Sequence, residues 1–381
     1  MERWPTPGDA VKVVLASLPA FGHVYPLVPL AVALERAGAT VVFATGGELG
    51  RRLPVRSVAG AEESWTFSAA TSELARRMEG TGVRSDRNLG QVLFVELCAP
   101  HVTDVMTAVL QRERPDLVVF EQTNVGAAIA AHRTGIRAVC QAIVGWGRQW
   151  SDIYDAVAAL VDLPSPDVLA EALIDPHPPF LADDEATPPF PTIAMRPTAW
   201  SPAGPLPPWL LEPRRAPRVY LTMGTVFGNL DLLRTMALEV AGTGCDTLVA
   251  TGPGTRPGDL GDVPATVHVE QEVPQVQVLP HVDVVVHHGG TGTIIGALGH
   301  GLPQVLVPQG ADQFWNADHI TAEGAGRTVL PGAPPGAVAE AVAALMEDAA
   351  PERIAARRLG GVISQMPGPD SVARLLTHGV A

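Results

Sequence analysis

The 381-residue chain has little lysine, and this shortage limits the partners it could have. Lysine and arginine together number 26, of which Lys12 is the only lysine, against 40 acidic residues, so the formal net charge is −14. A surface that binds nucleic acid or an anionic membrane needs clustered positive charge. We therefore expect neither partner. A phosphorylated small molecule remains open, because helix N-termini bind phosphate without net positive charge.

Cysteine is also scarce, and long apolar segments are absent. Cys98, Cys140 and Cys245 form no CxxC pair and leave an odd number, so neither a disulfide framework nor a zinc site is predicted. The apolar run 11–21 has no basic flank and no cleavage site, and no segment approaches the roughly 18 uninterrupted apolar residues of a membrane helix. We expect a cytoplasmic protein.

The chain does contain a regular alternation of strand and helix patterns. Val11–Ser17 is a continuous apolar run, typical of a parallel strand covered on both faces, and a helix is expected at 25–36 after it. Further elements of the first half are expected as strands at 40–45, 116–120 and 137–141 and as helices at 89–112 and 124–133. This alternation predicts a parallel α/β sheet.

A proline-rich stretch separates this half from a second one. Ten prolines fall within residues 187–217, which predicts an extended linker because proline is excluded from helix interiors and central strands. The second series has strands expected at 219–223, 246–251, 282–287 and 304–307 and helices near 230–241, 291–300, 316–323 and 335–348. The predicted fold class is α/β, with two parallel-sheet domains and a ligand-binding cleft between them.

The sequence HHGGTGT at residues 287–293 follows an apolar strand and opens a helix. Its glycines let a ligand approach the backbone, and the free N–H groups of the first helical turn favour an anion. Thr291 and Thr293 add hydroxyl donors, and a histidine can donate to a phosphate oxygen. These features suit a diphosphate, although a turn that only packs strand against helix has the same composition.

The same stretch also contains Gly290, Gly292 and Gly296 in a spacing similar to a dinucleotide-binding fingerprint, with Asp312 about 20 residues further on. A dehydrogenase is therefore an alternative, although this fingerprint normally opens the first βα unit of a domain. No metal site is predicted. His287 and His288 are neighbours on a strand and point to opposite faces, and the acidic residues 183–185 have no histidine nearby.

The loop Gly310-Ala311-Asp312-Gln313 follows another predicted strand. Asp312 and Gln313 offer acceptors and donors for neighbouring hydroxyl groups, which is what recognition of a sugar requires. The alternative is that Asp312 caps the next helix.

In the first half, His23 lies in the loop after the first strand and Glu121 ends the strand 116–120. The carboxyl ends of parallel strands share one edge of a sheet, so the two side chains are expected to meet. An imidazole there can act as a general base, and a carboxylate can hold its second nitrogen and stabilise the imidazolium. A structural histidine and a helix-capping glutamate are the alternatives.

Taken in order along the chain, these motifs resemble the nucleotide-binding signature of sugar-nucleotide-dependent glycosyltransferases from bacterial natural-product pathways, namely the macrolide, glycopeptide and enediyne enzymes. The resemblance covers nearly the whole chain. Its most specific segments are Val273-Pro274-Gln275, residues 287–293, Gly301-Leu302-Pro303, Asp312-Gln313 and Asn316-Ala317.

The resemblance implies the GT-B architecture, in which two Rossmann-like domains face each other across a cleft. The acceptor-binding domain would span residues 1–200 and the donor-binding domain residues 218–355. A C-terminal helix at 356–381 would pack back on the first domain. A homodimer remains possible.

The resemblance also implies roles for individual residues. His23 takes the place of the catalytic base and Glu121 that of its carboxylate partner, where many relatives have aspartate. Asp312 and Gln313 fall on the sugar-binding positions. The donor nucleotide and its diphosphate would be bound by Gly224, Thr225, Val273, His288, Gly290, Thr291, Gly292 and Thr293. Trp146 and Trp150, beside glycines, suit a flat apolar acceptor, with core packing as the alternative.

Two positions depart from the pattern of the relatives. Glu272 stands where many of them place an aromatic residue that stacks on the nucleobase. Gly296 stands where relatives that use UDP-glucose often carry a glutamate on the ribose, and its absence favours a dTDP-sugar.

The predicted function is an inverting, metal-independent transfer of a deoxysugar from a dTDP-sugar to a hydroxyl, or a similar nucleophile, of an apolar natural-product aglycone in antibiotic biosynthesis. The nucleotide-sugar is a co-substrate, and no further cofactor is expected. The alternatives are a nucleotide-sugar epimerase and a non-catalytic homologue that binds the sugar nucleotide.

Overall fold

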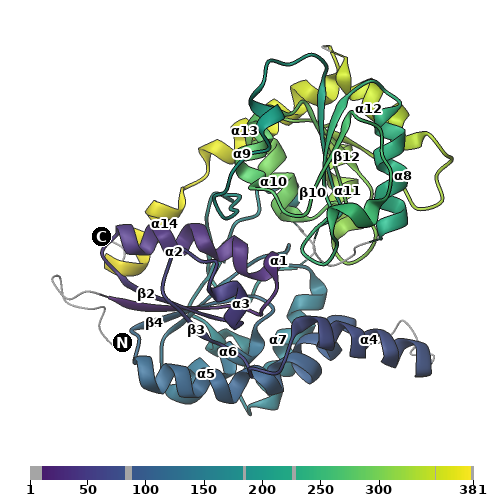
Figure 1. Ribbon diagram of the computed structural model, residues 1–381. Coiled ribbons are helices and arrows are strands. Elements are labelled where there is room, and N and C mark those ends of the chain that lie inside the picture. The colour runs from purple at the N-terminus through teal and green to yellow at the C-terminus, as the bar shows by residue number, and fades with distance from the viewer. Residues whose placement is uncertain (1–10, 82–87, 183–185, 225–228, 348, 379–381) are drawn as a thin grey trace. The chain divides into compact units, whose positions relative to one another are not determined.

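The computed structural model describes residues 11–81, 88–182, 186–224, 229–347 and 349–378 (Figure 1). The chain divides into two compact units, residues 1–197 together with 366–381, and residues 198–365. Each unit contains a fully parallel sheet with helices on both faces. This arrangement confirms the predicted α/β class.

The first unit is built on a seven-stranded sheet in the order β3-β2-β1-β4-β5-β6-β7. Its strands are β1 (Lys12–Ala16), β2 (Thr40–Thr45), β3 (Ser57–Ala59), β4 (Leu117–Glu121), β5 (Ala138–Gln141), β6 (Leu173–Asp175) and β7 (Thr192–Ala194). The central strands β1 and β4 are parallel neighbours, with Ala16 opposite Phe120. Because the two strands are in register, their carboxyl ends lie side by side.

Helices cover both faces of this sheet, which explains why its central strands are continuously apolar. They are α1 (Phe21–Val24), α2 (Val28–Arg36), α3 (Gly47–Gly50), α4 (Phe67–Thr81), α5 (Ala99–Glu113), α6 (Val125–Thr134), α7 (Arg148–Leu160) and α14 (Pro369–His378). Helices α5 and α6 pack together on one face, and α2 packs against α14 on the other.

A π-helix at Gln91–Cys98 leads directly into α5. Within the part of the chain that the structure describes, the combined stretch Gln91–Glu113 is the one helix long and apolar enough to span a membrane. The sequence did not suggest it because polar residues interrupt the apolar run. A core helix passes the same test of length and composition, and Val102, Met106 and Leu110 of α5 lie in the hydrophobic core of the first unit.

The second unit is built on a six-stranded sheet in the order β10-β9-β8-β11-β12-β13. Its strands are β8 (Arg218–Thr222), β9 (Asp246–Ala250), β10 (Val267–Glu270), β11 (Val284–His287), β12 (Gln304–Leu306) and β13 (Gly326–Thr328). Its helices are α8 (Leu230–Ala241), α9 (Gln275–Val278), α10 (Thr291–Gly299), α11 (Gln313–Ala322), α12 (Ala337–Met346) and α13 (Pro351–Gln365). Helices α8 and α12 pack together, as do α10 and α13.

The end of the proline-rich stretch belongs to the second unit, although a linker was expected there. The buried guanidinium of Arg218 donates hydrogen bonds to the backbone carbonyls of Trp209, Leu210 and Glu212. These bonds hold a short 3₁₀-helix at Pro208–Leu211 against the sheet. The division between the units therefore falls after Pro197.

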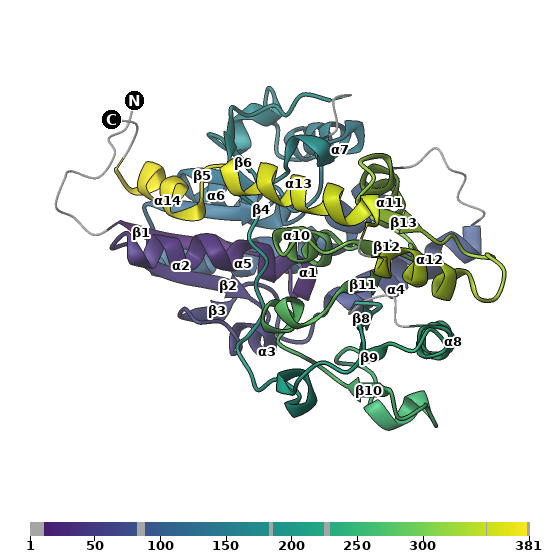
Figure 2. The same cartoon turned by 90° about the horizontal axis from the view of Figure 1, so that it is seen from above.

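The prediction of one C-terminal helix over 356–381 is wrong. The structure has two helices, α13 and α14 (Figure 2), because Pro367, Gly368 and Pro369 interrupt the helical pattern after Gln365. Helix α13 packs on α10 and belongs to the second unit, whereas α14 packs on α2 and belongs to the first.

Candidate active site

The first group of predicted site residues lies at the carboxyl edge of the sheet in the first unit. His23 is in the short helix α1 that follows β1, and Glu121 is the last residue of the neighbouring strand β4. The register of β1 with β4 brings these two positions together. His23 Nδ1 lies 3.2 Å from Glu121 Oε1, as the sequence predicted.

The two side chains differ in exposure. The Glu121 side chain is fully buried, whereas that of His23 is 14% exposed. Nδ1 faces the buried acceptors, which leaves Nε2 as the ring nitrogen able to accept a proton. The capping alternative for Glu121 is not observed, because Asn124 is the residue whose side chain caps α6, accepting from the N–H of Ala127.

Thr123 is a third member of this group that sequence reasoning missed. Its Oγ1 lies 2.9 Å from His23 Nδ1 and within 2.8 Å of both carboxylate oxygens of Glu121. Its backbone N–H also donates to Glu121 Oε2 at 2.6 Å, and the N–H of Leu18 donates to Oε1 at 3.3 Å. The only signal in the sequence was a hydroxyl residue two positions after a strand-ending carboxylate.

Aromatic side chains from two helical elements surround the imidazole. The ring of Phe67 in α4 lies 4.7 Å from the ring of His23, and that of Phe94 in the π-helix lies 6.4 Å away. Both are apolar neighbours of the imidazole that the sequence did not single out.

The predicted acceptor residues Trp146 and Trp150 are both in the core, which corrects that prediction. They are 5% and 4% exposed. Trp146 packs on Tyr154 and Phe190, and Trp150 stacks on Phe94. The glycines beside them permit tight packing, so the alternative reading holds.

The cysteines near this group are not candidate nucleophiles. Burial, and to a smaller degree the charge of Glu121, raises the pKa of the Cys98 and Cys140 thiols. Both thiols therefore stay protonated at neutral pH.

The second group of predicted residues lies in the second unit, where β11 runs into α10. The N-cap residue Gly290 provides no side-chain hydrogen bond, so the first N–H groups of α10 have no capping partner from it. Gly289 has a φ of +92°, which a glycine adopts readily. The positive end of the α10 dipole therefore lies at the carboxyl edge of the sheet, where β11 ends.

The side chain of His287 stabilises this turn through hydrogen bonds. Its fully buried ring lies with Nε2 2.8 Å from Gln304 Oε1, and its Nδ1 accepts the N–H of Gly289 at 3.0 Å. Burial lowers the pKa of His287 to about 3, so the ring is neutral. Its role is structural.

His288 stands between two of the predicted glycines. A Cβ added at Gly224 or at Gly290 would come within 2.5 Å of its ring, and Gly224 has a φ of +74°. Burial lowers the pKa of His288 to about 4, and its Nδ1 has no hydrogen-bond partner among the residues described. The structure therefore brings Gly224, His288 and Gly290 together. Thr225 lies outside the described residues.

The remaining predicted donor residues are Gly292 and Thr293 in the first turn of α10 and Val273 in the loop before α9. Thr293 is buried, and its hydroxyl donates to Gln275 Oε1 at 3.4 Å. Gly292 is exposed, and a Cβ added there would meet nothing within 4 Å. Val273 is half-buried in the loop before α9.

Asp312 is linked to this turn through side chains. Its Oδ2 accepts from Thr291 Oγ1 at 3.3 Å and from Asn316 Nδ2 at 2.9 Å, and Asn316 Nδ2 also lies 2.9 Å from the carbonyl of Gly289. Asp312 makes no capping bond to α11, so the capping alternative is not observed. Gln313 is only 3% exposed, and its Oε1 accepts from the N–H groups of Gln309 and Gly310. The buried Gln313 side chain therefore stabilises the loop at residues 309–310 through these two hydrogen bonds.

No group of three or more potential metal-ligating side chains occurs in the described ranges.

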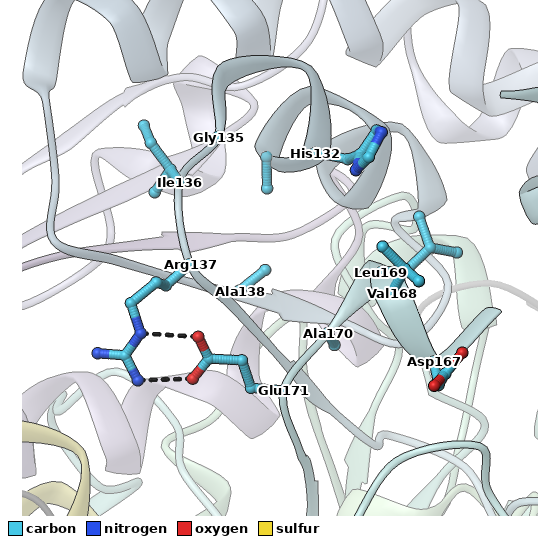
Figure 3. Close-up of a pocket in the computed structure, with 11 residues that line it drawn as sticks. His132, Gly135, Ile136, Arg137, Ala138, Asp167, Val168, Leu169, Ala170 and Glu171 are labelled. Atoms are coloured by element: carbon cyan, nitrogen blue, oxygen red, sulfur yellow. Dashed lines mark hydrogen bonds and ion pairs between the residues drawn. The ribbon is translucent and has the colours of Figure 1, made fainter. Parts of the chain in front are cut away.

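A pocket of about 220 Å³ lies at the amino end of β5, at the opposite end of that strand from the His23 group (Figure 3). Arg137 and Glu171 form two hydrogen bonds across it, at 2.7 and 2.5 Å. No predicted site residue lines it.

Two α/β units, each built on a parallel sheet with helices on both faces, are the architecture of GT-B glycosyltransferases. Residues 237–378 match the family described as "Erythromycin biosynthesis protein CIII-like, C-terminal domain". The chain is 32% identical to L-demethylnoviosyl transferase of Streptomyces niveus, over 95% of this chain and 97% of that protein. It is 31% identical to the elloramycin glycosyltransferase of Streptomyces olivaceus, over 96% and 97% of the two chains.

Solved structures show the same likeness. The Streptomyces sp. SF2575 glycosyltransferase SsfS6, complexed with thymidine diphosphate, has a TM-score of 0.79 and 27% identity over 96% of this chain and 99% of that one. SnogD from Streptomyces nogalater has a TM-score of 0.81 and 25% identity, over 97% and 99%.

The protein is a glycosyltransferase of the GT-B fold. More specifically, the chain belongs to the family of glycosyltransferases of antibiotic biosynthesis. This membership excludes the dehydrogenase alternative. The position of the glycine turn agrees, because it follows β11, whereas a dinucleotide-binding fingerprint normally follows the first strand of its unit, here β8.

Proposed function

We propose that the protein transfers a deoxysugar from a dTDP-sugar to a hydroxyl, or a similar nucleophile, of an apolar natural-product aglycone, with inversion at the anomeric carbon. The observation that carries the donor assignment is the relative SsfS6, 27% identical along nearly the whole chain, which was solved in complex with thymidine diphosphate. The second unit of this chain has an uncapped helix N-terminus with which to bind such an anion.

Donor recognition is assigned to the turn between β11 and α10. The N–H groups of Thr291 and Gly292 would bind the diphosphate, and the neutral ring of His288 would donate a hydrogen bond to it. As the bond between the sugar and the diphosphate breaks, negative charge grows on the leaving oxygen. The helix N-terminus stabilises that charge, so the proposed reaction needs no metal ion.

Sugar recognition is assigned to Asp312, whose Oδ2 is oriented by Thr291 and Asn316. A carboxylate held in this way can accept hydrogen bonds from sugar hydroxyl groups. Gln313 could contribute only its amide nitrogen, because its Oε1 already accepts two backbone N–H groups.

The preference for thymidine over uridine rests on position 296. A Cβ at Gly296 would lie 2.8 Å from Leu279 Cδ1, so a ribose-binding glutamate there would require the Leu279 side chain to move. A donor whose nucleoside is deoxyribose has no 2′-hydroxyl and therefore loses no hydrogen bond when the glutamate is absent.

Proton removal from the acceptor is assigned to His23. Its Nε2 would take the proton as the acceptor oxygen attacks the anomeric carbon, and Glu121 would balance the imidazolium charge. Phe94, which is half-buried and lies beside the imidazole, suits an apolar aglycone.

The proposal is tested first by binding. Saturating dTDP, at about 100 times its dissociation constant, should stabilise the protein against unfolding by roughly 2.7 kcal/mol, whereas NAD should not. UDP should stabilise it less than dTDP at equal concentration. Equal stabilisation by dTDP and UDP would remove the thymidine preference.

The test of catalysis is a His23→Ala variant in an acceptor-dependent assay. Loss of a general base should lower turnover by at least about a hundredfold and leave dTDP affinity unchanged. Conversion of the donor without any acceptor would instead support a nucleotide-sugar epimerase. A wild-type protein that binds dTDP and transfers to no acceptor would support the non-catalytic homologue.

A further inference from the structure

We infer that Thr123 is a positioning residue for the proposed transfer, because its hydroxyl connects the imidazole of His23 to the carboxylate of Glu121 and holds the imidazole in a single tautomer. The inference rests on the proposed role of His23 as the base. Thr123 is 2% exposed, so its hydroxyl is shielded from water.

The direction of the hydrogen bonds follows from counting protons. Glu121 already accepts backbone N–H groups from Leu18 and Thr123, so its side chain acts as an acceptor. The Thr123 hydroxyl lies 2.8 and 2.7 Å from the two carboxylate oxygens and must donate its one proton to them. Its lone pairs then accept the N–H of His23 Nδ1 at 2.9 Å.

The hydroxyl offers the nearer partner to the imidazole. Nδ1 lies 2.9 Å from Thr123 Oγ1 but 3.2 Å from Glu121 Oε1. With Nδ1 protonated and engaged, Nε2 carries no proton and is ready to accept one. The tautomer that the base requires is thus set by Thr123 together with Glu121.

The same geometry explains how the chain accommodates a glutamate at this position. The side chain of Glu121 turns toward the N–H of Thr123, which it accepts at 2.6 Å, and this bond fixes the carboxylate against its own loop. The hydroxyl of the same residue adds a second, nearer partner for the ring.

The experiment compares Thr123→Val, which lacks the hydroxyl, with Thr123→Ser, which retains it. Loss of one hydrogen bond to a charged group is expected to cost about tenfold, which corresponds to about 1.4 kcal/mol or one pH unit. The valine variant should therefore lower kcat by about tenfold and shift the acidic limb of the kcat/KM profile about one unit toward lower pH, because the imidazolium loses an acceptor. The serine variant should stay within about threefold of wild type, with the limb unmoved.

A second measurement does not depend on activity. The imidazole nitrogens of His23 are observed by ¹⁵N NMR and assigned by their loss in His23→Ala. Wild type and Thr123→Ser should show Nδ1 protonated at neutral pH, and Thr123→Val should shift the ring toward the Nε2-protonated form. Thr123→Ala is measured alongside, since it removes the hydroxyl without adding atoms in case valine prevents folding.

The outcomes separate this inference from the proposed function. An unchanged tautomer and an unchanged pH limb in the hydroxyl-free variants would overturn the role of Thr123, while a dead His23→Ala variant would still support His23 as the base. Full activity in His23→Ala would remove the base assignment, and the NMR result would still decide whether Thr123 sets the tautomer.

Discussion

Burial makes the two adjacent histidines at the end of β11 chemically unlike an exposed histidine. It lowers the pKa of His287 to about 3 and that of His288 to about 4. Both rings are therefore neutral at physiological pH, and each can donate one N–H. For His287 this N–H is committed to Gln304, whereas His288 lies beside the uncapped end of α10.

The lowered pKa of His287 predicts how stability depends on pH. The unfolded chain takes up a proton at this residue near pH 6.5, and the folded chain does so only near pH 3. The free energy of unfolding should thus fall as the pH drops from about 6.5 to 4, by up to about 1.4 kcal/mol per pH unit for this proton. Replacing His287 by Gln should remove that part of the slope in urea titrations at a series of pH values.

The control for this prediction is His132→Gln. His132 is exposed on α6, so the same change of side chain there tests for effects unrelated to burial. A His287→Gln variant with the slope of wild type would show that this ring is not a source of the pH dependence.

At the scale of elements, the turn between β11 and α10 is shaped by close packing of backbone against rings. Gly290 and Gly224 lie so near His288 that neither can carry a side chain without moving the ring. The Asn316 side chain bonds the carbonyl of Gly289 from the start of α11. The geometry of this turn therefore depends on contacts among β8, β11, α10 and α11.

This packing predicts different effects for two alanine substitutions near or within α10. A Cβ at Gly290 would lie 2.5 Å from His288 Nε2, whereas a Cβ at Gly299 would meet nothing within 4 Å. Gly290→Ala should weaken dTDP binding by about tenfold or more, equivalent to about 1.4 kcal/mol. Gly299→Ala should leave it unchanged in the same calorimetric titration. Equal affinities in both variants would place the diphosphate elsewhere.

Strands that are buried on both faces were easier to predict from the sequence than short strands at the sheet edges. Strands covered on both faces are continuous apolar runs, so β1, β4, β8 and β11 were predicted to within a residue or two. The short strands β3, β7, β10 and β13 at the sheet edges gave no such run and were missed, as was the three-residue interior strand β6. Strand β7 even lies within the proline-rich stretch, where an edge position tolerates prolines nearby.

The site was predictable to the same extent and for a related reason. Parallel strands end at one edge, so the meeting of His23 with Glu121 followed from the strand pattern alone. The roles of Thr123 and Gln313 depend on the direction in which a loop turns its side chains, and no periodicity encodes that direction. Trp146 and Trp150 were misassigned because composition does not show which face of a loop is buried.

At the scale of the whole molecule, the last helix belongs to the unit that begins the chain. Helix α14 buries Val372, Ala373 and Leu376 and packs on α2, the helix that follows His23. An ion pair of 2.8 Å joins Arg36 to Asp370, but both side chains are more than half exposed. The apolar contact should therefore dominate the attachment.

Two variants measure this difference. Leu376→Ala should destabilise the first unit by about 2–5 kcal/mol, because Leu376 is 3% exposed and the change leaves a cavity. Asp370→Ala should change stability by no more than about 1 kcal/mol. Hydrogen exchange followed by mass spectrometry should show loss of protection in peptides covering 28–36 for Leu376→Ala and none in the second unit. Equal effects of the two variants would contradict this ranking.

The return of the chain to its starting unit has a consequence for biosynthesis on the ribosome. Residues 198–365 are contiguous and can complete their contacts once they have left the exit tunnel, whereas the first unit also needs residues 366–378, which are translated after them. A transcript truncated after codon 365 would encode every proposed donor-binding residue and still yield a first unit lacking one of its helices. We therefore expect the first unit of a nascent chain to finish folding after the second, although most of it is synthesised first.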